Sequence, residues 1–130
     1  MFIHSSLSKL LKYVDEESDH PFLRQPYTQL SLMYLNTGNY RGRLFVLEQL
    51  LKINQRLVGD FEWQLAEDHL NIGENHIQLD QIPQAIEHLL QAEMYAQSGL
   101  DSGELSKKER TECITMLSRV YNKFYILYAI

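Results

Sequence analysis

Histidine is the residue type whose spacing most invites chemistry in this chain. His69 and His76 are seven positions apart, which on a helix is about two turns or roughly 10 Å, too far for both to hold one metal ion directly. His88 lies on the next predicted helix and could approach either of them, with Glu74 or Glu87 as a further ligand. A small metal-dependent enzyme is therefore one alternative. Packing between helices explains the same residues without a metal, and we expect no metal site.

The other residue types that could carry catalysis lack the neighbours that catalysis requires. Cys113, the single cysteine, has no histidine close to it in sequence, so a structural or partly exposed thiol is expected rather than a nucleophile. The carboxylate runs 67–68 and 15–17 are typical of solvated helix faces. The chain has no glycine-rich phosphate loop, nucleophile elbow or His-Glu-x-x-His motif. We predict no enzymatic activity, no catalytic residue and no cofactor.

Composition and charge exclude several classes of function. The 130 residues carry 12 Lys plus Arg against 17 Asp plus Glu, a net charge of −5, so no basic surplus is available to neutralise the phosphates of a nucleic acid. The longest apolar run, 124–130, is far shorter than the roughly twenty residues that a membrane helix needs. The start of the chain does not resemble a secretory signal. We expect a cytoplasmic protein that binds neither nucleic acid nor membrane.

Apolar residues recur at helical spacing along almost the whole chain, and no segment alternates as a half-buried strand would. The connections between the periodic segments are short, which favours antiparallel helical hairpins. We predict an all-α chain with helices at about 5–14, 22–37, 40–57, 61–79, 82–97 and 105–128.

Turn and capping residues mark the ends of these helices. Gly38 can adopt the left-handed backbone that ends a helix. Asp80 can cap the helix that follows it, and Pro83 falls in the first turn of that helix. The stretch 98–103 is expected to be a loop. After it, Ser106 followed three residues later by a glutamate forms a capping-box pattern.

Three segments of the chain are alike: 30–34, 72–76 and 117–121. In each, a branched apolar residue is followed by a small residue and, three positions further on, by an aromatic or imidazole ring. The small residues are Ser31, Gly73 and Ser118, which are 42 and 45 positions apart. Because a small side chain lets two helix axes approach closely, we expect these three residues to mark equivalent helix crossings.

This pattern resembles the tetratricopeptide repeat, in which a Leu-Gly-x-x-Tyr motif, a turn and spaced alanines form a helical hairpin. The second copy matches the family's small, small, large and small positions at Gly73, Ala85, Leu89 and Ala92. The first copy matches at Leu30, Ser31, Tyr34, Gly38, Tyr40, Leu47 and Leu50. In that copy Arg43 stands where the family has alanine, and the adjacent Gly42 could relieve the crowding. The spacing, longer than the usual 34 residues, is similar to that of the kinesin light chain type.

The resemblance implies a short right-handed superhelix of stacked antiparallel hairpins, with about six helices. It implies a single domain, 1–130. Within this domain we expect an N-terminal helix at 1–18, one repeat at 19–58, a second at 59–98, and a half-repeat or capping helix at 104–130.

In this family the first helix of each pair lines a concave surface that binds extended or helical peptides. Carried over by offset, the groove residues are Thr28, Gln29, Leu32, Asn36, Glu67, Asn71, Glu74, Gln78, Thr115, Arg119, Asn122 and Lys123. Amide side chains suit this role because each can both donate to and accept from a peptide backbone. Glu67 and Glu74 would repel a carboxylate, so a basic or neutral peptide is favoured.

The last predicted helix is apolar nearly all round towards its end, whereas a terminal repeat normally presents a polar face. This helix is therefore expected either to fold back on the stack or to dock on another molecule. The residues proposed for such a contact are Tyr121, Phe124, Tyr125, Leu127 and Tyr128. A homodimer formed through this helix is the preferred hypothesis.

Taken together, these patterns favour a non-catalytic module that binds a peptide or a partner protein in a helical groove. The alternative is a regulatory or sensor domain in which ligand binding or dimerisation controls an effector.

Overall fold

The computed structural model describes residues 21–59 and 61–129, and all regular structure in these ranges is helical. The predicted all-α class is therefore confirmed for the described residues, whereas the N-terminal helix predicted at 5–14 within 1–18 lies outside them. The chain divides into two compact units, Met1–Leu57 and Val58–Ile130. None of the described helices combines the length and apolar character that crossing a membrane requires.

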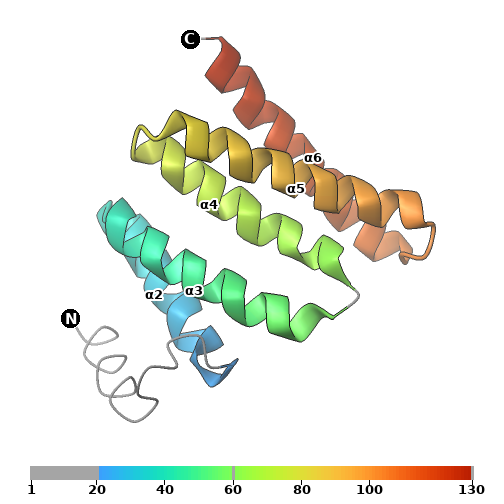
Figure 1. Cartoon of the computed structure of the whole chain (residues 1–130), viewed down its shortest axis with the longest axis horizontal. Coiled ribbons are helices and arrows are strands. Elements are labelled where there is room, and N and C mark those ends of the chain that lie inside the picture. The colour runs from blue at the N-terminus through green and yellow to red at the C-terminus, as the bar shows by residue number, and fades with distance from the viewer. Residues whose placement is uncertain (1–20, 60, 130) are drawn as a thin grey trace. The chain divides into compact units, whose positions relative to one another are not determined.

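The first unit contains a short 3₁₀ helix, η1 (Pro21–Leu23), followed by α2 (Arg24–Thr37) and α3 (Tyr40–Val58) (Figure 1). Gly38, between α2 and α3, has φ +73°, the left-handed conformation predicted for it. Asn39 then caps α3, because its Oδ1 accepts a hydrogen bond of 3.0 Å from the Gly42 N–H.

Gly42 allows a close contact between α2 and α3. A Cβ atom on Gly42 would lie 3.0 Å from Cε2 and Cζ of Tyr34, so any larger residue would push this ring away. The neighbouring Arg43 is buried, with 7% of its surface exposed, at the position where the repeat family has alanine. The small residue at the contact between α2 and α3 is therefore Gly42, one position before the residue at which the family has alanine.

The second unit contains η2 (Glu62–Leu65), α4 (Ala66–Gln78), α5 (Ile82–Ser102) and α6 (Lys107–Tyr128). Figure 1 shows α4 and α5 side by side as a hairpin. α5 contacts η2, α4 and α6, and α6 also contacts α4. One core cluster contains Ala66, Ala96, Cys113, Met116 and Leu117, and the other contains Leu70, Leu89, Ala92 and Val120.

Gly73 allows α5 to lie close against α4. A Cβ atom on Gly73 would lie 3.1 Å from Cγ and Cδ2 of Leu89 and 3.3 Å from the carbonyl oxygen of Ala85. The predicted role of this small residue is therefore confirmed. Ser31 is also buried, but Ser118 lies on the exposed side of α6, so the expectation of three equivalent crossings is wrong for Ser118.

The loop predicted at 98–103 is mostly helix, because α5 continues to Ser102 and the chain turns only at Gly103, which has φ +70°. Gly99, which favoured a loop in the sequence, is a packing residue. A Cβ atom on Gly99 would lie 2.8 Å from Cβ of Trp63. This glycine is therefore required by the contact between α5 and η2 rather than by a reversal of the chain.

The capping predictions have mixed outcomes. Asp80 does not cap α5: it adopts φ +58° in the turn, and Gln81 holds the N-cap position, where its side chain makes no capping bond to α5. Pro83 does fall in the first turn of α5. The capping box of α6 is confirmed, since the Glu109 N–H donates to Ser106 Oγ at 3.2 Å and the Ser106 N–H donates to Glu109 Oε1 at 2.9 Å.

Substituting Gly73→Leu is expected to lower the free energy of unfolding of the second unit by about 2 kcal/mol, because the added side chain overpacks the contact with Leu89. Urea unfolding followed by the fluorescence of Trp63, the single tryptophan, measures this unit. The matched control is Ser118→Leu, on the exposed side of α6, which should stay within about 0.5 kcal/mol of the unsubstituted protein. Equal losses for the two variants would contradict the packing role of Gly73.

Candidate binding face on α4 and α6

Five of the eight residues predicted for the groove of the second and third copies meet between α4 and α6. Arg119 of α6 donates from Nη2 to Glu74 Oε1 at 3.1 Å and to Asn71 Oδ1 at 3.5 Å, while its Nη1 lies 3.8 Å from Glu67 Oε1. Lys123 Nζ lies 3.6 Å from Glu74 Oε2. We call the surface formed by these five residues the α4/α6 face.

The α4/α6 face has balanced charge. Its two carboxylates, Glu67 and Glu74, are paired with the two cations Arg119 and Lys123. The Glu74 side chain is only 22% exposed, whereas that of Glu67 is 63% exposed. Pairs at this exposure contribute about 0–1 kcal/mol each to stability. The expectation of a basic or neutral peptide assumed free carboxylates, whereas each of these carboxylates has a cation beside it.

The remaining groove candidates are divided between the two units. Gln78, Thr115 and Asn122 are exposed on α4 and α6, although the Thr115 hydroxyl already donates to the Thr111 carbonyl at 2.9 Å. The four candidates of the first copy are exposed on α2, in the first unit. These are Thr28, Gln29, Leu32 and Asn36.

The apolar end of α6 has two kinds of side chain. Phe124 and Leu127 are half-buried and pack on the core of the second unit, so this helix folds back on its own hairpin. Tyr125 and Tyr128 are each 74% exposed, and Tyr121 is 49% exposed. Of the five residues proposed for an external contact, the three tyrosines therefore remain accessible.

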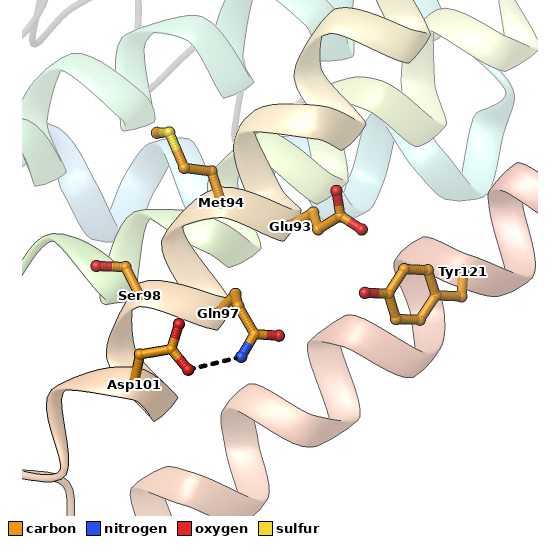
Figure 2. A pocket seen from close by; sticks show the side chains of 6 residues that line it. All are labelled: Glu93, Met94, Gln97, Ser98, Asp101 and Tyr121. Carbon is orange, nitrogen blue, oxygen red and sulfur yellow. Dashed lines mark hydrogen bonds between the residues drawn. The ribbon is translucent and has the colours of Figure 1, made fainter.

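Tyr121 reaches across to α5, as Figure 2 shows. Interaction of its hydroxyl with the Glu93 carboxylate is the main reason why the pKa of Tyr121 is raised. Gln97 Nε2 donates to Asp101 Oδ1 at 2.9 Å beside it. With Met94 and Ser98, these residues line an open pocket of about 500 Å³. The sequence did not indicate this pocket, because residues 98–101 were predicted to be a loop.

The histidines of α4 and α5 form a stacked row. His88 lies between His69 and His76, with ring centroids 5.2 Å and 5.5 Å away. The Nδ1 atoms of His69 and His88 are 3.0 Å apart, so one donates and the other accepts. At one end of the row, His76 Nδ1–H donates to Gln81 Oε1 at 2.7 Å. At the other end, Tyr95 stacks on His69.

Within 21–59 and 61–129, no three His, Cys, Asp or Glu side chains are arranged to hold a metal ion.

Burial controls the ionisation of two groups in this unit. Desolvation of His69, assisted by the nearby His88, lowers the pKa of His69 from 6.5 to about 4. Cys113 is fully buried, and desolvation followed by the charges of Glu112 and Glu109 raises its pKa. His69 is therefore neutral at pH 7 and acts as a packing group, and the Cys113 thiol is a core residue.

Comparison of the chain with protein-family models, curated proteins and solved structures found no match. The repeat resemblance accordingly rests on the sequence pattern of this chain alone.

Lowering the pH from 7 to 5 is expected to destabilise the second unit by about 2 kcal/mol through His69. Above pH 6.5 this histidine is neutral in both the folded and the unfolded chain. Below pH 6.5 the unfolded chain binds a proton that the folded chain excludes, so stability falls until the pH reaches the folded pKa of about 4. Urea unfolding at pH 7, 6 and 5, followed by Trp63 fluorescence, measures the loss.

The matched variant for this prediction is His69→Phe, which keeps a ring in the stack but cannot titrate. The free energy of unfolding of this variant at pH 7 does not matter, because the two proteins are compared by how much this free energy changes between pH 7 and pH 5. The variant should lose about 2 kcal/mol less than the unsubstituted protein over the same interval. The same loss in both proteins would show that His69 does not control this pH dependence.

Proposed function

We propose that this chain is a non-catalytic interaction module, built from helical hairpins of the tetratricopeptide type, that binds a peptide segment of a partner protein on the α4/α6 face. The observation that carries this proposal is the network in which Arg119 of α6 bonds to Asn71 and Glu74 of α4. This network joins α4 and α6, which are separated along the chain by α5, into one continuous polar surface.

The packing of the second unit supports the repeat assignment. Gly73, Ala85 and Leu89 meet at the crossing of α4 and α5, at the offsets that the family uses for its small and large packing residues. Cys113, Met116, Leu117 and Val120 then bury one side of α6 on this hairpin. An arrangement in which a third helix contacts both members of a preceding pair is what a stack of hairpins requires.

The mechanism of binding would be pre-organisation. The side chains of Arg119 and Glu74 are already held by one another, so a ligand would not have to order them. Gln78 and Asn122 are exposed on the same two helices and carry amides that can pair with a peptide backbone. Because the charges of the face are balanced, a peptide with no net charge is the expected ligand class.

A displayed library of uncharged peptides, selected on the full chain, tests this function. Peptides selected at pH 7 should lose about tenfold in affinity when Asn122→Arg places a long charged side chain on α6, a change of about 1.4 kcal/mol in binding free energy. Fluorescence polarisation of the selected peptides measures the affinity.

The control for this experiment is Gln84→Arg, which adds the same side chain at an exposed position of α5. It should leave the affinity unchanged. Failure to select any peptide, or equal losses for the two variants, would contradict peptide binding on the α4/α6 face.

The exposed tyrosines of α6 favour a second interaction, self-association of the chain. Tyr125 and Tyr128 each present 74% of their surface. Tyrosine is enriched in protein interfaces because it combines a large apolar ring with a polar hydroxyl. We therefore include a homodimer formed through α6 in the proposal.

Sedimentation equilibrium tests the dimer. The chain should self-associate with a dissociation constant below about 100 µM, and Tyr125→Arg should leave it monomeric. The control is Thr115→Arg, at an exposed position of α6 away from Tyr125 and Tyr128 in the sequence, and it should not change the association. A monomer at every concentration up to about 200 µM would exclude this interface.

A further inference from the structure

A second pocket, of about 400 Å³, lies among η2, α5 and the segment that leads into α6. Its volume is within the range of sites that hold small molecules or single side chains. The residues that give it its chemical character are three aromatic and three acidic ones, namely Phe61, Trp63, Tyr95, Glu62, Glu104 and Glu109. All of them belong to the second unit.

The aromatic walls of this pocket are fixed by the core. Trp63, Tyr95 and Leu105 pack against the buried cluster that contains Ala96. Gly99 lines the pocket between them, and only a residue without Cβ fits there beside Trp63. The Tyr95 ring is held in addition by its stack on His69, with centroids 5.6 Å apart. The pocket therefore presents two rings, those of Trp63 and Tyr95, whose positions do not depend on a ligand.

All charged residues in the lining of this pocket are glutamates. Glu62 and Glu104 are exposed, while Glu109 is half-buried and accepts the capping bond from Ser106. The lining residues include no lysine, arginine or histidine. The faces of aromatic rings are themselves electronegative and attract cations. The rings and the carboxylates of this pocket therefore both attract a positively charged group.

From these observations we infer that the pocket binds the side chain of an arginine presented by a partner protein. The guanidinium group is planar, so it can stack on Trp63 or Tyr95 while its edge donates to Glu62 or Glu104. The ammonium of lysine is a compact, strongly hydrated charge and cannot stack in this way. This inference does not rest on the proposed function, because none of the residues of the α4/α6 face lines the pocket.

The full chain offers a direct readout of this site, because Trp63 is the only tryptophan. The probe is the peptide acetyl-Gly-Arg-Gly-amide, and the matched control peptide carries citrulline, the uncharged analogue of arginine. The arginine peptide should shift the indole N–H resonance of Trp63 and its fluorescence saturably, with a dissociation constant of the order of millimolar. Citrulline should bind at least about fivefold more weakly, and added salt should weaken only the arginine complex.

Two variants separate this site from a general attraction to an acidic protein. Glu104→Gln removes an exposed charge of the lining and should weaken the arginine peptide about threefold. Glu112→Gln removes an exposed charge outside the lining and should not weaken it. Tyr95→Leu removes one stacking face and should weaken the peptide about fivefold, with the helical circular dichroism unchanged.

Several results would overturn the assignment. Equal binding of the arginine and citrulline peptides would show that the pocket does not select charge. Equal binding of a lysine peptide would show that it does not recognise the guanidinium plane. Absence of any shift in the Trp63 resonance at about 20 mM peptide would exclude a millimolar site.

Discussion

The second unit depends on how closely α5 lies against α4 at Gly73. With no Cβ at this position, Leu89 and the Ala85 carbonyl occupy space that any other residue would need. Because the two helices are this close, α6 can contact both of them. That double contact allows Arg119 to reach Asn71 and Glu74, 48 and 45 positions earlier in the chain. The close contact at Gly73 thus supports the helix arrangement on which the polar surface is built.

The two surfaces proposed to bind partners differ in how their charges are satisfied. On the α4/α6 face, each carboxylate has a cation from α6 beside it, so little field extends into the solvent. In the aromatic pocket, Glu62 and Glu104 share a lining that contains no cation. The first surface is therefore suited to polar contacts with an uncharged chain, and the second to a single positive group. One small unit can present both because they are built from different residues.

Periodicity and capping residues predicted most of the helices, since Gly38, Pro83 and the Ser106 capping box act through local backbone physics. The error at 98–103 occurred where a distant contact accompanies the local structure, whereas the error at Asp80 concerns the local geometry of a turn. Gly99 favoured a loop from its own propensity, but Trp63, 36 positions earlier, holds it in a helix. The seven-residue spacing of His69 and His76 predicted that the two rings lie about two helical turns apart. Only tertiary packing, however, places the ring of His88 between them. The aromatic pocket could not be predicted for the same reason, because its walls come from three segments.

The contacts of the second unit also bear on how it acquires its structure. Within the described part of this unit, η2, α4, α5 and α6 pack mainly on their neighbours in the chain, and the contacts of η2 with α5 and of α4 with α6 are the exceptions. Chains dominated by such local contacts close small loops and fold quickly. We expect the hairpin of α4 and α5 to form early, with α6 adding to a surface that already exists. In a chain that emerges from the ribosome, α6 would then be the last helix of this unit to dock, and its Val120 would complete the cluster around Leu89.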